Sequence, residues 1–310
     1  MYKRQYLYRM TYNIKEDNAD TTKKAVVPKG AEVLLESRYP YLDDSQIRYI
    51  LYSTAVSSGY SVLDDAEGWG RLNLFEAANG YGAFDTNVTV NMDASKGGFN
   101  VADNWKNDIS GTGSLTKEGS GMLVLSGNNS YTGNTIVDGG SIRADYASAF
   151  GNSSIVNNSV INENTDDTLI INGNYKQNKS GVLELTISNE NDYVDITGNA
   201  ELGGKLVLNF KDYIPSTDAE IIKCASVASQ FDEIEINAPE GFEGKIAYND
   251  NGVDLVFSQK TDNNTAQNEI SSPQTGDTSH VVMAFTAFVL SLAGILTASF
   301  ASKIKSDRIR

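Results

Sequence analysis

The chain has 310 residues, of which 40% are hydrophobic and 21% charged, so it is long enough for one or two domains with apolar cores. Its formal net charge of −15 is the opposite of the basic surface that binds a phosphate backbone, so we expect no nucleic-acid partner. A single cysteine, Cys224, and a single histidine, His280, exclude an internal disulfide and a histidine-based metal cluster. We expect no cofactor and no metal site.

The N-terminus does not resemble a secretory signal peptide, because residues 1–20 contain no apolar run of seven residues. Residues 1–5, MYKRQ, resemble the translation of a sequencing adapter, and we exclude them from fold reasoning. Because an exported protein needs a signal, we expect the front of the protein to be missing.

Residues 6–84 are predicted to contain two short helices. Asp43 and Asp44 are placed to cap a helix that runs through Ile47 and Leu51 toward Gly59, and a second helix is predicted over residues 71–78. Two short helices do not make an independent domain, so we interpret this region as the C-terminal remnant of a larger one.

Three stretches around this region carry a resemblance to a known family. They are TYNIKEDNADTTKKAVVPKGAEVLLESRYPYL (11–42), SSGYSVLDDAEGWGRLNLFEAANGYGAFD (57–85) and TVNMDASKGGFNVADNWKNDISGTGSLTKEGSG (89–121). Together they resemble the region after the catalytic core in bacterial PAP2-family acid phosphatases that carry an appended β-strand repeat. The resemblance implies a missing N-terminal domain that hydrolyses phosphate monoesters through a histidine nucleophile.

The catalytic motifs of that family do not occur in this chain. They are Lys-x6-Arg-Pro, Pro-Ser-Gly-His and Ser-Arg-x5-His-x3-Asp. Ser37-Arg38 begins like the third motif, but Asp44 stands where its histidine would fall, so we interpret Ser37-Arg38 as incidental. His280 is far in sequence from any partner residue. We therefore expect no catalytic residue and no phosphatase activity in this chain, which would serve as a stalk and anchor.

Residues 68–74, GWGRLNL, support a different interpretation. A Gly-x-Gly-Arg-x-Asn stretch that leads into a helix resembles the end of the catalytic domain of subtilisin-like proteases. Two alternatives therefore stay open beside the phosphatase: a structural surface protein or adhesin with autotransporter-type repeats, and a remnant of a surface subtilisin-like protease. Upstream sequence would discriminate them, through Pro-Ser-Gly-His, further repeats, or a Gly-Thr-Ser nucleophile motif.

Residues 85–258 consist of short runs of alternating hydrophobicity separated by Gly and Asn. Alternation with period two is typical of strands, and it occurs at residues 87–92, 122–125, 168–172, 182–187 and 205–210. We predict a mainly β fold: a right-handed parallel β-solenoid with a short α-helical N-terminal remnant and one C-terminal transmembrane helix. The Asn/Asp clusters at residues 162–167 and 189–195 are interpreted as solvated turns rather than Ca²⁺ sites, because they lack EF-hand spacing.

Residues 111–144, GTGSLTKEGSGMLVLSGNNSYTGNTIVDGGSIRA, resemble the autotransporter-associated β-strand repeat of bacterial surface proteins. We expect Leu115, Leu123 and Leu125 to point into the solenoid core and Tyr131 to cover one turn. The glycines would permit corners with positive φ. Downstream, Cys224 is interpreted as a small buried hydrophobic residue.

The C-terminal part is predicted to be a flexible linker (259–271) followed by an anchoring signal (272–310). Residues 281–300 carry no charge and would span about 30 Å as a helix, which suffices for a transmembrane helix. The basic residues that follow predict a short cytoplasmic tail. Ser272, Pro273, Gln274, Thr275 and Gly276 resemble the Leu-Pro-x-Thr-Gly sorting signal of Gram-positive surface proteins, with Ser272 in place of the leucine. The resemblance implies a sortase and peptidoglycan as partners, and attachment to the wall or membrane of a Gram-positive cell.

Overall fold

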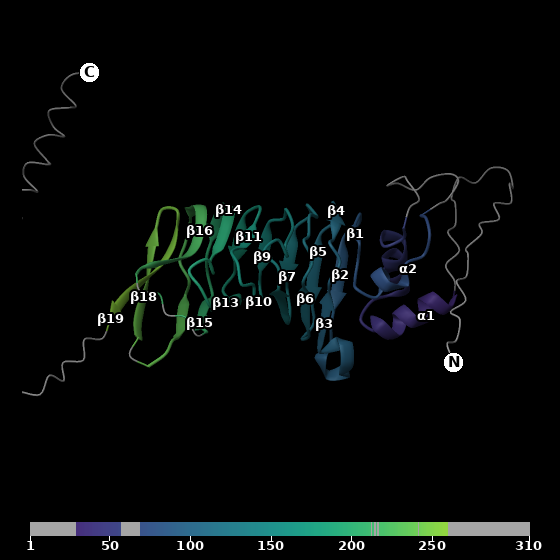
Figure 1. Ribbon diagram of the computed structural model, residues 1–310, viewed down its shortest axis with the longest axis horizontal. Helices are drawn as coiled ribbons and strands as arrows, with labels where there is room; N and C mark the ends of the chain where they lie inside the picture. The colour runs from purple at the N-terminus through teal and green to yellow at the C-terminus, as the bar shows by residue number, and fades with distance from the viewer. Residues whose placement is uncertain are drawn as a thin grey trace, which may run out of the picture. The chain divides into compact units, whose positions relative to one another are not determined.

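A computed structural model describes residues 29–56, 69–211, 213, 215, 217–240 and 242–259 (Figure 1). Three helices come first: α1 (Lys29–Arg38), α2 (Asp44–Ser53) and α3 (Leu74–Ala77). Asp43 caps α2 as predicted, and the side chains of Asp43 and Gln46 form a reciprocal capping box. We refer to residues 29–56 and 69–82 as the helical segment.

The helical segment differs from the prediction at three points. Helix α1 was not predicted, because its apolar residues do not form one stripe: Leu35 is buried while Val33 and Leu34 are exposed. Helix α2 ends at Ser53, before the predicted Gly59. Arg71 lies outside α3, since its backbone forms an isolated antiparallel bridge with Val56.

The rest of the described chain is a mainly β solenoid, as predicted, and most of its strands are parallel (Figure 1). One long sheet contains β3 (Ala102–Trp105), β6 (Met122–Leu125), β8 (Ser141–Ala144), β10 (Val160–Glu163), β13 (Val182–Ile187), β15 (Lys205–Phe210) and β17 (Glu233–Asn237). The other contains β2 (Val88–Asn91), β5 (Leu115–Glu118), β7 (Thr135–Val137), β9 (Ile155–Asn157), β11 (Leu169–Ile171), β12 (Tyr175–Gln177), β14 (Val194–Glu201), β16 (Ala219–Val227), β18 (Phe242–Asn249) and β19 (Gly252–Gln259). A short third sheet pairs β1 (Ala83–Phe84) with β4 (Ser110–Gly111).

The turns of the solenoid stack in a regular register. Leu115 pairs with Thr135, Thr135 with Ile155, and Ile155 with Tyr175, so equivalent positions in these turns lie 20 residues apart. In the first turn Val88 pairs with Leu115, because two 3₁₀ turns, η1 (Ala94–Lys96) and η2 (Gly98–Asn100), add residues between β2 and β3.

Stacked apolar side chains form the interior of the solenoid. In the seven-stranded sheet Leu123, Ile142, Ile161, Leu183 and Leu206 occupy one in-register column, and each is at most 1% exposed. Complete burial of one such side chain contributes about 1.5–3 kcal/mol, so a column that continues through successive turns stabilises the stack.

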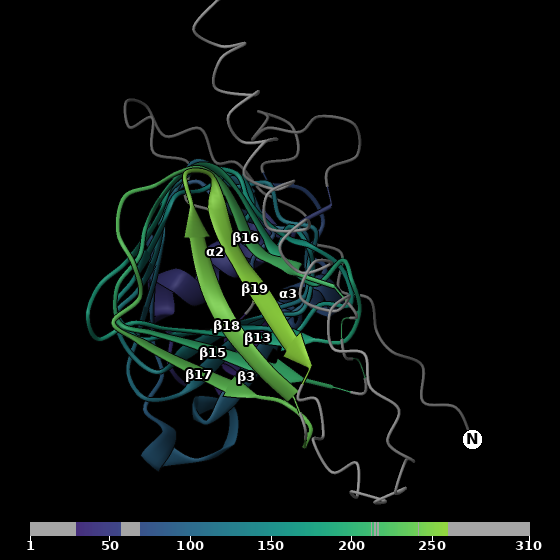
Figure 2. The same cartoon turned by 90° about the vertical axis from the view of Figure 1, so that its left-hand side faces the viewer.

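The C-terminal end of the solenoid departs from the predicted run of parallel strands up to Phe257. Strand β19 pairs antiparallel with both β16 and β18, so the described part of the solenoid ends in an antiparallel hairpin (Figure 2). No helix among the described residues is long and apolar enough to cross a membrane. The predicted transmembrane helix at residues 281–300 and the sorting signal at residues 272–276 lie outside the described residues.

Candidate functional site

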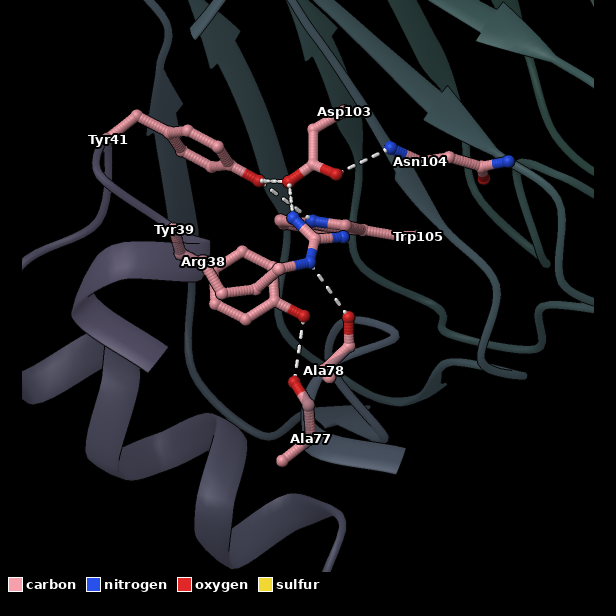
Figure 3. A network of polar contacts seen from close by, with 8 residues as sticks. All are labelled: Arg38, Tyr39, Tyr41, Ala77, Ala78, Asp103, Asn104 and Trp105. Atoms are coloured by element: carbon pink, nitrogen blue, oxygen red, sulfur yellow. Dashed lines mark hydrogen bonds and ion pairs between the residues drawn. The ribbon is translucent and has the colours of Figure 1, made fainter. Parts of the chain in front are cut away.

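The helical segment is joined to the N-terminal end of the solenoid by a buried polar network (Figure 3). Arg38 Nη1 lies 2.5 Å from Asp103 Oδ2, and Arg38 Nε donates to the Ala78 carbonyl at 3.1 Å. The Tyr41 hydroxyl donates to the same Asp103 oxygen, and Trp105 Nε1 donates to the Tyr41 hydroxyl at 3.1 Å. Asp103, on β3, is therefore the carboxylate at which the two parts of the chain meet.

Asp103 points into the solenoid, although most residues in its column are apolar. It pairs in register with Leu123, the first leucine of the apolar column described above, and it is 4% exposed. A buried carboxylate is stable only when charged or polar donors surround it, and Arg38, Tyr41 and the Asn104 backbone N–H supply them. Figure 3 shows these groups converging from both sides of the junction.

An aromatic cluster lies beside this network. Tyr81 and Trp105 have ring centroids 5.1 Å apart, Tyr81 and Phe84 5.4 Å, and Phe84 and Tyr131 5.1 Å. All four rings are fully buried, and aromatic pairs at these separations stabilise beyond simple burial. We call Phe84, Asp103, Trp105 and Tyr131 the mouth of the solenoid.

Further hydrogen bonds cross the junction away from Asp103. Gln46 Nε2 donates to the Thr89 carbonyl at 2.7 Å, and the Tyr49 hydroxyl donates to Asp85 Oδ2 at 2.5 Å. Asn107 Nδ2 donates to two carbonyls of the helical segment, and the backbone N–H of Lys106 donates to a third. Hydrogen bonds therefore connect the helical segment to the solenoid at several places besides Asp103.

A second buried polar feature lines one corner of the solenoid. Lys117, Val137, Asn157 and Gln177 stack in register on β5, β7, β9 and β12. Lys117 Nζ donates to the carbonyls of Glu118 at 2.6 Å and of Gly139 at 3.1 Å, while burial lowers the pKa of this amine to about 8.

Asn157 and Gln177 repeat this arrangement with amides: Asn157 Nδ2 donates to the Val182 carbonyl, and Gln177 Nε2 donates to the carbonyls of Gly181, Gly203 and Lys205. These donors satisfy turn carbonyls that would otherwise be buried without partners.

Two acids are buried at another corner. Glu163 is 4% exposed and accepts from the backbone N–H groups of Thr165 at 2.5 Å and Thr186 at 3.1 Å. Burial raises the pKa of its carboxyl to about 7, and the nearby Asp192 adds to the rise. Asp192 itself accepts from Ser188 and Asn189 within its own turn.

The residues singled out from the sequence lie in scaffold positions. Leu115, Leu123, Leu125 and Tyr131 are fully buried, and the Tyr131 hydroxyl lies 2.7 Å from Thr135 Oγ1. Cys224 is a buried free thiol, and burial raises its pKa. Neither Asn/Asp cluster, nor any other part of the chain that the structure describes, brings three His, Cys, Asp or Glu side chains together so that they could hold a metal ion. His280 lies outside that part.

The sequence interpretation missed the residues of the junction. Ser37-Arg38 is not incidental to the structure, because Arg38 binds Asp103, whereas Ser37 is exposed and donates only to the Val33 carbonyl. Asp103 sits at an inward position of an alternating strand, and an acid at such a position is the one signal that could have pointed to the junction.

Comparisons with known proteins connect this chain to autotransporters. Residues 115–144 match the passenger-associated-transport-repeat model. An autotransporter lipoprotein, NalP, of Neisseria meningitidis is 35% identical over 194 residues, which cover 60% of this chain and 17% of that protein. An extracellular serine protease of Serratia marcescens is 33% identical over 147 residues, covering 37% of this chain and 14% of that protein. The adhesin BmaC autotransporter of Brucella suis is 51% identical over 47 residues, covering 15% of this chain and 1% of the adhesin.

These matches correct the predicted function and location. The acid phosphatase prediction is wrong, because the relatives include an autotransporter lipoprotein and an extracellular serine protease. The Gram-positive, wall-anchored location is also wrong, since these relatives come from Gram-negative bacteria; the predicted sortase and peptidoglycan partners depended on that location. The two alternatives, an autotransporter-type surface protein and a serine protease remnant, agree with these relatives better than the phosphatase prediction does. The chain spans less than a fifth of the length of these relatives.

Proposed function

We propose that this chain is the junction between an upstream serine protease domain and the β-solenoid of a Gram-negative surface or secreted protein of the autotransporter kind. The observation that carries the proposal is the joined architecture: a helical segment packed on the mouth of a solenoid that contains a passenger-type repeat. The relatives include both an autotransporter lipoprotein and an extracellular serine protease. The chain itself would act as scaffold.

The local structure of residues 70–77 supports this assignment. Gly70 adopts a φ of +96°, Arg71 bridges to Val56, and Asn73 caps α3 by accepting from the Glu76 N–H. The Gly-Arg-x-Asn stretch therefore leads into a helix, as in the end of a subtilisin-like catalytic domain that it resembles. We propose residues 6–84 as that end, residues 85–258 as the solenoid and residues 259–271 as a linker.

Three large apolar side chains of the helical segment are exposed. Val33 and Leu34 on α1 are 57% and 62% exposed, and Phe75 on α3 is 75% exposed. Exposed apolar side chains of this size lose contact with water when a partner domain covers them. We propose that the upstream protease domain covers them. The finer features, a right-handed coil and a membrane span at residues 281–300, remain parts of the proposal.

The proposal is tested on the complete gene from which the sequence derives. The region upstream of residue 6 should encode a Gly-Thr-Ser nucleophile motif. A fluorophosphonate probe, which reacts with activated serine hydroxyls, should label the full-length product and should not label the 310-residue chain. Replacement of the motif serine with alanine is the control and should abolish labelling.

A structural adhesin is the second candidate, favoured by the match to the Brucella adhesin. It predicts further repeats upstream in place of a nucleophile motif, and no labelling by the probe. That combination would overturn the protease assignment while leaving the solenoid as a scaffold.

A further inference from the structure

The mouth of the solenoid contacts two side chains of the helical segment, the guanidinium of Arg38 and the phenol of Tyr41. Asp103 occupies an inward position that is Leu123 in the next turn and Ile142 in the turn after. A carboxylate at this position stays buried only because Arg38 and Tyr41 reach it from the helical segment. The Arg38 guanidinium is also held between aromatic rings, 4.5 Å from the Tyr39 centroid and 4.3 Å from the Phe99 centroid.

The buried core of the helical segment is continuous with that of the solenoid, since Ile47 and Ile50 of α2 belong to the same cluster of buried side chains as Trp105. Its helices have 10, 10 and 4 residues, and helices of this length are marginal in water without tertiary packing. Its buried Tyr81 packs on Phe84 and Trp105 of the mouth, and Gly80 approaches Trp105 so closely that an added Cβ would lie 2.8 Å from that side chain. Without the first turn of the solenoid, these side chains would lose the surface that buries them.

The solenoid depends less on the helical segment than the helical segment depends on the solenoid. The turns that follow stack on one another through in-register columns such as Leu123, Ile142 and Ile161, and neither of these two pairings involves a helix. If the helical segment left, water would reach Asp103 and solvate its charge. The aromatic part of the mouth would also be exposed, and repeat proteins tolerate local opening at their ends.

We propose that the mouth is a docking surface on which the end of the upstream domain completes its fold, with Asp103 as the positioning residue. The docking is one-sided: the helical segment requires the solenoid, and the solenoid does not require the helical segment. The identity of the docked part as the end of a protease rests on the proposed function, but the docking itself is a property of this chain.

The test is hydrogen exchange measured by mass spectrometry on the full 310-residue chain. Asp103→Leu restores the apolar column and removes the partner of Arg38, and Arg38→Gln weakens the pair from the other side. We expect amides of α2 to exchange at least tenfold faster in both variants, while amides of β8, β10 and β13 keep their wild-type rates. The matched control is Glu201→Gln, which breaks an exposed ion pair with Lys176 on the solenoid and should change neither region.

Two results would overturn the proposal. In one, α2 keeps its protection in both variants; in the other, β8, β10 and β13 lose protection by the same factor as α2, which would mean that the two parts unfold together. If Asp103→Leu does not fold, Arg38→Gln decides alone. None of these readouts involves proteolytic activity, so failure of the docking and failure of the protease assignment are distinguishable.

Discussion

At the scale of single residues, the solenoid interior contains polar groups that its apolar columns do not predict. Lys117 and Glu163 are both buried, one as an amine that binds turn carbonyls and the other as a carboxyl that accepts two backbone N–H groups. Burial moves their pKa values in opposite directions, to about 8 and about 7. Both shifts disfavour the charged form, so each residue makes stability depend on pH.

Glu163→Gln tests this dependence. The folded pKa of about 7 lies above the ordinary glutamate pKa of 4.5, so the stability that the protonated carboxyl contributes is complete below pH 4.5 and is lost as the pH rises through 7. The wild-type free energy of unfolding should therefore fall between about pH 4.5 and pH 8, relative to that of the variant, by on the order of 3 kcal/mol. Urea unfolding at a series of pH values measures this difference.

The control for that experiment is Glu190→Gln, which changes an exposed acid in the neighbouring turn. Its difference from the wild-type protein should stay within about 0.5 kcal/mol at every pH. A Glu163→Gln difference that is equally flat with pH would contradict the assignment of a buried, protonated carboxyl.

At the scale of strands and turns, the close stacking of corners sets which residues are allowed. Gly140 has a φ of +61°, and an added Cβ would lie 2.2 Å from the Gly121 carbonyl oxygen of the turn below. Glycine is needed there for two separate reasons: the left-handed backbone and the approach of the next turn. Gly98 has a similar φ of +56° but nothing within 4 Å of an added Cβ.

Substitutions of Gly98 and Gly140 distinguish the cost of the left-handed backbone from the cost of the close approach between turns. Gly98→Ala should cost about 1–2 kcal/mol, which is the backbone term alone. Gly140→Ala should cost about 4 kcal/mol, because the backbone of an adjacent turn must also shift. Denaturant unfolding monitored by circular dichroism gives both values, and equal losses would show that corner stacking contributes nothing.

At the scale of the whole molecule, the two ends of the solenoid are covered by different elements. The helical segment covers the N-terminal end, while β18 and β19 cover β16 at the C-terminal end as an antiparallel hairpin (Figure 2). An uncovered strand edge would present unpaired backbone groups to other molecules. The hairpin contributes Val253 and Leu255 to the core, and neither is exposed.

Leu255→Asp should detach this hairpin, since an unpaired carboxylate would replace a fully buried leucine. We expect the freed edge of β16 to cause self-association that increases with protein concentration, measured by sedimentation velocity. Val256→Asp is the matched control: Val256 is 37% exposed and pairs with Lys245, so this variant should sediment like the wild-type protein. A Leu255→Asp variant that sediments identically to wild type at all concentrations would show that the hairpin does not protect the edge.

The local elements and the kind of fold follow from short-range patterns in the sequence. Alternation of period two marked β13 and β15, and Asp43 marked the start of α2, because pleating and helix capping depend on neighbouring residues. The resemblance of residues 111–144 to a β-strand repeat indicated stacked turns, because each repeat buries its apolar face against its neighbours. The wrong phosphatase assignment came from stretches that contain no catalytic motif, and such scaffold residues do not specify the chemistry of an attached domain.

The elements that cover the two ends of the solenoid, and the partners of its buried polar residues, are visible only in the folded structure. Arg38 and Asp103 are 65 residues apart, and no local pattern links an arginine at a helix end to an acid on a strand. The reversal of β19 depends on pairing with β16, and Glu163 is buried only because later turns cover it. These contacts form between residues that are distant along the chain, so their energies depend on the assembled fold.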